Sequence, residues 1–355
     1  MRVVITGATG NVGTALLRRL SGEPDVEVVG VVRRLPPPTP PYDRATWRSL
    51  NLADPGVRPE LLETLRGADA VVHLAWQIQP THDPVLLHRT NVNGSSAVIE
   101  AAVRAGVPTL VHASSVGAYA PGPKDRLVDE DWPTAGVPGS GYSRDKSTVE
   151  RQLDAVESQL RVVRLRPALI FQWDAGCELA RYFLGPLVPT GWLRRGRIPL
   201  VPDNPALRLQ AVHADDVADA YVRALRGDVR GAFNLAAEPV LSPRGIAEAL
   251  HGRTVPVPAA FLSAGVRVSW LLGLQPVDRG WIELALRVPL LSSARANTEL
   301  GWTPKVDATT ALRELIAGLA EHGSTQSPPL SARPSLPGRF GGLLRGHLPG
   351  SGNPY

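Results

Sequence analysis

The 355-residue sequence contains a single cysteine, Cys177, and its eight histidines include no pair at metal-ligand spacing. One cysteine alone excludes an intramolecular disulfide and a thiolate metal cluster, and the histidine spacing does not predict a zinc site. We interpret Cys177 as a small buried hydrophobic residue rather than a reactive nucleophile. No metal is therefore expected in the chemistry of this protein.

Long apolar runs are also missing. A membrane-spanning helix needs about 18 predominantly apolar residues, and the nearest stretch, 259–277, is interrupted by Arg267 and ends in Gln275-Pro276. It is interpreted as a helix that packs on the protein, the alternative being a helix that lies on a membrane surface. Because the chain runs directly from Met1 into a strand and a glycine-rich loop, a cleaved signal would remove that loop. We expect a cytoplasmic protein with no membrane span.

Lysine is scarce: Lys124, Lys146 and Lys305 are the only three among 38 basic residues, so 38 − 3 = 35 are arginine. The net charge is +5, and no basic stripe follows a predicted element, so nucleic acid is not an expected partner. Because arginine cannot give up its proton and has a different shape, a lysine at a motif position indicates a specific role. Lys146, four residues after Tyr142, is such a lysine.

What is present is an alternation of apolar strands with helices. Strands are expected at 2–6, 26–32, 70–74, 109–113 and 161–165, separated by helices at 12–20, 59–66, 84–105 and 143–157. This alternation predicts βαβ units and a parallel sheet. Farther along, two strands at 208–212 and 231–235 are expected to rejoin that sheet, on either side of a helix at 214–225.

The sequence therefore predicts an α/β protein with a doubly wound, parallel-sheet Rossmann fold. The Rossmann domain is expected over 1–170, rejoined by about 208–240. A smaller, mostly helical substrate-binding part is expected from 171–207 and 241–322. The remaining residues, 323–355, are rich in proline, glycine, serine and arginine, which predicts a disordered tail.

A glycine-rich loop, Thr6-Gly7-Ala8-Thr9-Gly10-Asn11-Val12-Gly13, joins the first strand to the first helix. In a dinucleotide site the three glycines permit a tight turn, close approach of the pyrophosphate and close helix–strand packing. The start of the helix then holds the phosphates. A purely structural loop is the alternative, but the strand before and the helix after are the context that the motif requires.

Arg33-Arg34 follows the second strand, where a site that prefers NAD has an acidic residue for the ribose 2′-hydroxyl. A guanidinium pairs instead with a 2′-phosphate. The pair therefore favours NADP over NAD, the alternative being two solvated loop arginines.

These residues, with further motifs in order along about 1–320, resemble the extended short-chain dehydrogenase/reductase family, also called the NAD-dependent epimerase/dehydratase family. The motifs are HLA at 73–75, NVNG with Asn91, ASSVGAY at 113–119, YSRDK at 142–146, RP at 166–167, VHADDVA at 212–218, NLA at 234–236 and LGWTPK at 300–305. The resemblance implies an oxidoreductase-type enzyme and, because dimers are common in the family, a homodimer. It implies cofactor-binding roles for Gly7, Thr9, Gly10, Asn11, Val12, Gly13, Arg33, Arg34, Leu74, Ala75, Asn91 and Lys146.

The resemblance further implies catalytic roles for Ser115, Tyr142 and Lys146. Positions i and i+4 share a helix face, so Tyr142 and Lys146 should point together into the pocket. A phenol has a pKa near 10, and an ammonium about 4 Å away would lower it toward about 7, where general acid–base catalysis is efficient. Ser115 would bond the substrate oxygen, with Ser114 as the competing choice.

Two other polar features have competing interpretations. Asn91 either helps to organise the cofactor pocket or is an ordinary polar residue on a helix face. Asp215 and Asp216 are interpreted as residues at a helix N-terminus, suited to its dipole, rather than as a catalytic carboxylate pair.

The sequence departs from the family pattern in places that bear on the substrate. Val116 and Gly117 stand where sugar-nucleotide dehydratases of the family have Asp-Glu, so dehydratase activity is not expected. Residues 168–173 also lack the asparagine-containing pattern of the sugar-nucleotide epimerases. A set of aromatic and basic residues could recognise an anionic or aromatic small molecule, or could form a surface lid: Trp173, Trp192, Arg194, Arg195 and Arg197.

Three functions remain open. The first is an NADP- or NAD-linked reductase or dehydrogenase that acts on a carbonyl/alcohol pair of a small molecule. The second is a sugar-nucleotide epimerase that recycles tightly bound NAD. The third is a non-catalytic NADP sensor, against which the intact set Ser115, Tyr142 and Lys146 argues, because a sensor has no need of proton transfer.

Overall fold

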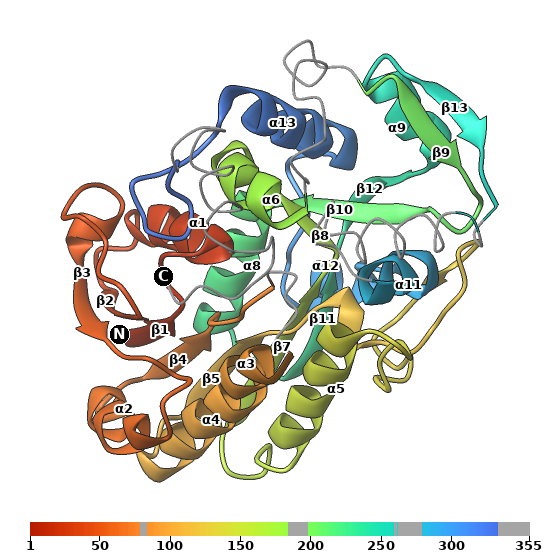
Figure 1. Ribbon diagram of the computed structural model, residues 1–355. Helices are drawn as coiled ribbons and strands as arrows, with labels where there is room; N and C mark the ends of the chain where they lie inside the picture. The colour runs from red at the N-terminus through yellow and green to blue at the C-terminus, as the bar shows by residue number, and fades with distance from the viewer. Residues whose placement is uncertain (79–83, 184–197, 259–260, 262–278, 333–355) are drawn as a thin grey trace.

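The protein is described here by a computed structural model, which covers residues 1–78, 84–183, 198–258, 261 and 279–332. Its centre is a seven-stranded sheet in the order β11-β7-β5-β4-β1-β2-β3, with every neighbouring pair parallel (Figure 1). The strands are β1 (Arg2–Thr6), β2 (Glu27–Val32), β3 (Ala45–Ser49), β4 (Ala70–His73), β5 (Thr109–Ala113), β7 (Arg161–Pro167) and β11 (Gly231–Leu235). The predicted Rossmann-type fold is confirmed.

Helices cover both faces of this sheet. Along β1, Val3 and Ile5 face the core formed with α1 (Asn11–Leu20) and α8 (Ala214–Arg226), while Val4 faces the opposite core. That opposite core is formed with α2 (Arg58–Leu65), α4 (Gly94–Arg104) and α5 (Gly141–Asp154). Because side chains alternate across a strand, a run of apolar residues such as RVVIT supplies both cores at once.

The rest of the described chain builds a smaller part beside the carboxyl ends of the strands (Figure 1). It holds a three-stranded sheet of β8 (Leu169–Phe171), β10 (Leu209–His213) and β12 (Ala237–Leu241), and the pair β9 (Leu200–Asp203) and β13 (Arg253–Pro256). Its helices are α6 (Gly176–Phe183), α9 (Pro243–Ala249), α11 (Arg279–Arg287), α12 (Ala294–Glu299) and α13 (Ala308–Glu321). A short pair, β6 (Leu127–Val128) and β14 (Leu290–Leu291), joins the two parts.

One expectation about the elements is wrong, and the structure adds two features that were not predicted. The strand expected at 208–212 does not rejoin the main sheet: β10 pairs with β8 and β12, whereas β11 does join β7. An apolar run cannot reveal which of two sheets will bury it. The helix expected over 84–105 is divided into α3 (Pro84–His88), a π-helical turn (Arg89–Asn93) and α4, and the edge strand β3 was missed because it is largely exposed.

The tail expected to be disordered from 323 onward is ordered as far as 332. Ser327 and Leu330 are completely buried there, so this segment contributes to the core despite its composition. The helix expected within 259–277 falls almost entirely outside the described residues. No helix in the described ranges is both long and apolar enough to cross a membrane.

Candidate functional site

The glycine loop has the local geometry that a dinucleotide requires. Gly7 has a φ of +72°, and a Cβ there would lie 2.6 Å from the backbone nitrogen of Ala75. A Cβ on Gly13 would lie 2.5 Å from the carbonyl carbon of Ala8. Gly10, in contrast, meets only the oxygen of Gly7, at 3.5 Å, and faces the cavity described below. The loop is thus tight at both ends and open at its middle, which fits a pyrophosphate.

Helix α1 starts at this loop without a side-chain cap and without an acidic residue in its first turn. Uncapped amide groups and the positive end of the helix dipole suit an anion. Gln172 fixes this turn from the other part of the molecule, because its amide donates to the backbone oxygen of Asn11 at 3.0 Å and also to the Asn11 side chain. Gln172 was not predicted, since nothing in the sequence links positions so far apart.

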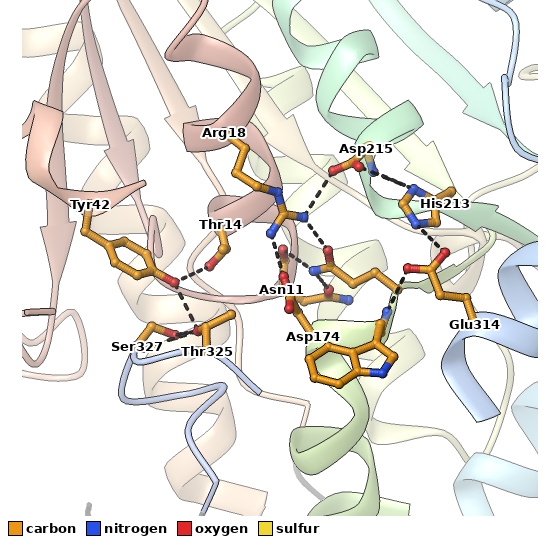
Figure 2. A network of polar contacts seen from close by, with 12 residues as sticks. Asn11, Thr14, Arg18, Tyr42, Asp174, His213, Asp215, Glu314, Thr325 and Ser327 are labelled. Carbon is orange, nitrogen blue, oxygen red and sulfur yellow. Dashed lines mark hydrogen bonds and ion pairs between the residues drawn. The ribbon is translucent and has the colours of Figure 1, made fainter. Parts of the chain in front are cut away.

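The C-terminal segment, residues 323–332, lies against the same loop. The Ser327 hydroxyl donates to the backbone oxygen of Thr9 at 2.9 Å. Thr325 bonds the Tyr42 hydroxyl at 3.1 Å (Figure 2). Tyr42 in turn bonds Thr14 of α1, at 3.1 Å. The end of the described chain therefore supports the loop that opens the first βα unit.

The other predicted cofactor residues lie around this loop at the ends of strands. Arg33 and Arg34 follow β2, with Arg33 exposed and Arg34 half-buried. Leu74 and Ala75 follow β4, and Leu74 lines the cavity. Asn91 is buried and holds the backbone of Gln77 by two hydrogen bonds, of 2.8 and 2.9 Å. Asn91 thus fixes the chain beyond β4, which agrees with its interpretation as an organising residue.

Ser115, Tyr142 and Lys146 line one cavity together with the glycine loop. The Ser115 hydroxyl accepts from the amide of Gly117 at 3.0 Å and is hydrogen-bonded to the phenol of Tyr142. The competing residue, Ser114, also lines the cavity, but its hydroxyl donates to buried Glu150 at 2.5 Å. The geometry therefore favours Ser115 over Ser114 as the partner of Tyr142.

The expectation that Lys146 lowers the pKa of Tyr142 toward about 7 is wrong. Burial raises the pKa of Tyr142 to about 12, although its hydrogen bond with Ser115 opposes the shift. The Lys146 ammonium lies 5.9 Å from the centre of the phenol ring, so it does not bring the pKa near 7. Burial also lowers the pKa of Lys146 itself, to about 7, against the charge of Glu150. Tyr142 is consequently protonated at neutral pH.

Two tryptophans that the sequence reasoning missed enclose this pair. The Lys146 nitrogen lies 3.5 Å from the centre of the Trp76 ring and donates to the backbone oxygen of Ala113 at 2.6 Å. Trp281 of α11 packs on Tyr142 with ring centres 5.1 Å apart. Trp76 directly follows the HLA motif, which was a usable signal, whereas α11 reaches Tyr142 only through the tertiary fold.

Glu150, one helical turn after Lys146, anchors a buried charge cluster behind the site. Arg166 binds both of its carboxylate oxygens at 2.9 Å, and Arg164 approaches at 3.0 Å. Burial alone would raise the pKa of Glu150, but the hydrogen bonds and charge of Arg166 hold it below its ordinary value. The cluster fixes α5 to β7, and through Ser114 it fixes the segment that carries Ser115.

The cavity itself has a volume of about 360 Å³. The glycine loop and Lys146 line it together with residues of η4 (Val116–Ala118), β8, β10, α6 and α11. Because the glycine loop, Ser115, Tyr142 and Lys146 all line this one cavity, the residues present fit a bound nicotinamide dinucleotide. Among the described residues no group of three or more His, Cys, Asp or Glu side chains could hold a metal ion.

The remaining predicted residues lie elsewhere. Asp216 is buried and accepts from the amides of Lys305 and Val306, and Asp215 pairs with Arg18 of α1 at 3.1 Å, so both have structural partners. Trp173 does not line the cavity, and its indole donates to Glu321 of α13. Cys177 is half-buried rather than buried. Trp192, Arg194, Arg195 and Arg197 lie outside the described residues.

Comparison with known proteins agrees with this geometry. The sequence profile of the NAD dependent epimerase/dehydratase family matches residues 3–236. An uncharacterized protein of Mycobacterium tuberculosis is 28% identical over 316 residues, which is 88% of this chain but only 29% of that protein. The sterol-4-alpha-carboxylate 3-dehydrogenase of Saccharomyces cerevisiae is 30% identical over 182 residues, 48% of this chain and 51% of the enzyme.

Among solved structures, the UDP-glucose 4-epimerase of Thermus thermophilus, in complex with NAD, superposes with a TM-score of 0.66 at 23% identity. The match covers 90% of this chain and 99% of the epimerase. At that identity the likeness establishes the shared fold.

Proposed function

The chain belongs to the NAD dependent epimerase/dehydratase family, the extended type of short-chain dehydrogenase/reductase, and on that premise we propose that it transfers a hydride between a nicotinamide cofactor and a carbonyl/alcohol pair of a small molecule. One observation carries the proposal. Ser115, Tyr142 and Lys146 meet in the cavity that the glycine loop lines. The relative in yeast that is named a 3-dehydrogenase supports the same class of reaction.

In the direction of reduction, Tyr142 would donate its proton to the carbonyl oxygen of the substrate. The high pKa of this phenol keeps the proton in place until negative charge develops on that oxygen. Ser115 would bond the same oxygen, and Lys146, with a pKa of about 7, can restore the proton. When bound, the nicotinamide ring supplies the hydride, so the carbonyl compound gains one hydride and one proton and becomes an alcohol.

The first test replaces Tyr142 by Phe, which removes the proton and keeps the ring that packs on Trp281. We expect turnover to fall at least about a hundred-fold, the contribution typical of an acid–base group. The dissociation constant of the dinucleotide should change by less than about two-fold. Full activity in Tyr142→Phe would refute the mechanism.

For the cofactor, we propose a preference for NADP, supported by the position of Arg33 and Arg34 directly after β2. The double variant with Gln at both positions should weaken NADP binding at least about ten-fold, because a charge-assisted pair is lost, and leave NAD binding unchanged. Equal weakening of both dinucleotides would contradict a role in recognising the 2′-phosphate.

An epimerase is the second candidate, and it makes a different demand on the cofactor. It returns the hydride within one turnover and so retains NAD. Mass spectrometry of the nucleotide released on denaturation separates the two functions: about one NAD per chain supports the epimerase, whereas an empty chain or NADP supports the reductase.

A further inference from the structure

Beyond Tyr142 the cavity wall is apolar. It is built by Val116 of η4, Leu169 of β8, and Trp281, Leu284 and Val288 of α11 and its C-terminal end. Leu284 and Val288 are buried. Hydroxyl groups of a sugar placed against such a wall would lose their hydrogen bonds to water without replacement. The wall therefore fits an apolar substrate body.

One polar residue of this wall, Gln210, is already occupied. Its amide nitrogen donates to the backbone oxygen of Leu291 at 3.0 Å, and its amide oxygen accepts from the Leu291 nitrogen at 2.6 Å. These two bonds pin β10 to β14. Gln210 is consequently a structural cross-link and has little left to offer a substrate.

Arg208, directly before β10, is different. It is half-buried, it lines the cavity, and its guanidinium makes no ion pair with any carboxylate in the described part of the chain. Glu178 of α6 lines the same cavity but is not within ion-pair distance of Arg208. A partly buried guanidinium without a carboxylate partner is costly, and it is well shaped to bind a planar anion by two parallel hydrogen bonds.

A second cation lies next to Arg208. The Lys124 nitrogen donates to the backbone oxygen of Arg208 at 3.0 Å and to that of Ala285 in α11 at 2.9 Å. Burial, and next the charge of Arg208, lower the pKa of Lys124 to about 8. No ion pair to a carboxylate is found for Lys124 either, within the described ranges. Lys124 thus adds positive charge while it fixes the position of Arg208 relative to the apolar helix.

We infer that the substrate is an apolar alcohol or ketone that carries an anionic group, a carboxylate above all, and that Arg208 binds this group while the apolar wall holds the body. The inference rests on the proposed hydride transfer for the reacting end of the molecule. It adds a recognition site at the other end of the substrate, made by the Arg208 guanidinium, which has no carboxylate partner among the described residues, beside an apolar surface.

The test uses two hydroxy acids of different shape, lithocholate and ricinoleate. Each acid is compared with its uncharged amide, and UDP-glucose is included as an anion with a polar body. Binding to the protein saturated with its dinucleotide is measured by calorimetry, and reduction of the cofactor is followed by absorbance. We expect at least one acid to bind about ten-fold more tightly than its amide, as a charge-assisted contact would give.

Arg208→Gln should abolish that preference, and Arg208→Lys should keep part of it, which also shows that the position tolerates replacement. Arg66→Gln, at an exposed position directly after α2 that does not line the cavity, removes the same charge and should keep the full preference. The inference is overturned if acid and amide bind equally, if neither acid binds, if the preference survives Arg208→Gln, or if UDP-glucose binds more tightly than both acids.

The two proposals fail separately. An acid that binds through Arg208 but never reduces the cofactor would refute hydride transfer and leave the anion site standing. If the amide is bound and oxidised with the same efficiency as its acid, the anion site is refuted and hydride transfer still stands. Tyr142→Phe should retain the preference in binding while it loses turnover.

Discussion

At the scale of single residues, Gly117 decides how Tyr142 is placed. A Cβ at this position would lie 2.6 Å from one ring carbon of Tyr142 and 3.1 Å from another. In the sequence, Gly117 stands at a position where the dehydratases of the family have an acidic residue. The structure adds that no side chain at all fits there while the phenol stays against Ser115.

Gly117→Ala should therefore displace the Tyr142 ring. We expect kcat to fall at least about ten-fold, since small misplacements of a reacting group are costly, with dinucleotide affinity unchanged. Gly22→Ala is the matched control, because a Cβ there meets only ordinary van der Waals contact at 3.7 Å. Equal kcat values for Gly117→Ala and wild type would show that the ring position is not critical.

Burial of Lys146 predicts a specific dependence of stability on pH. Its pKa is about 7 in the folded protein and near 10.4 in an unfolded chain. Between these values the unfolded chain binds more protons, so the free energy of unfolding rises with pH. The contribution of Lys146 should grow by about 2 kcal/mol between pH 7 and pH 9.

Lys146→Met should remove this part of the slope when unfolding by urea is measured across that pH range. Lys305→Met serves as the control, because Lys305 is exposed and should leave the slope as it is. Lys124→Met should remove a smaller part of the rise in unfolding free energy, and at higher pH, because the pKa of Lys124 is about 8. A slope that is identical in wild type and Lys146→Met would contradict the burial of this amine.

The residues that the sequence could and could not identify differ in one physical respect. Ser115, Tyr142 and Lys146 belong to local motifs with fixed spacing, and the fold brings them together as the motifs imply. Gln172, Trp281 and Arg208 act on partners more than fifty positions away, and no period or spacing encodes such contacts. Their roles depend on how the smaller part packs on the sheet.

At the scale of elements, α5 is joined to the segment that carries Ser115 through Ser143. This buried hydroxyl donates to the backbone oxygen of Gly117 at 2.5 Å and accepts from the amide of Val137 at 2.6 Å. The first turn of α5 is therefore fixed to both neighbouring loops. Tyr142, one residue earlier, is held in place by that cross-link.

Ser143→Ala would leave two buried backbone groups without partners. We expect the free energy of unfolding to fall by about 2–4 kcal/mol, measured by urea denaturation with dinucleotide absent and present. Thr148→Ala, on the same helix but bonded only within it, should cost much less. A loss of equal size in both variants would mean that the contact between Ser143 and Gly117 contributes little.

The elements also show where sequence reasoning is limited. Strands of the main sheet were recognised because burial on both faces makes them continuously apolar. Edge strand β3 is only partly buried, and the π-helical turn at Asn91 depends on the distant backbone of Gln77. Both features result from tertiary contacts that override local preference.

At the scale of the whole molecule, the segment 323–332 connects the last helix to the first loop. Truncation after residue 322 would remove the Ser327 contact with Thr9 and the burial of Leu330. We expect a decrease of about 2–5 kcal/mol in the free energy of unfolding and weaker dinucleotide binding, measured by thermal denaturation and by titration. Truncation after residue 332 is the control and should change neither quantity.

The contact between Ser327 and Thr9 also has a thermodynamic corollary. Docking of segment 323–332 and filling of the glycine loop by the dinucleotide involve the same backbone, so any coupling between them shifts both equilibria by an identical factor. Because the Ser327 contact supports the glycine loop, a protein or fused domain that pulls this segment away should lower the affinity for the dinucleotide. By reciprocity, a saturating dinucleotide must compete with such a binding partner, although the two never touch.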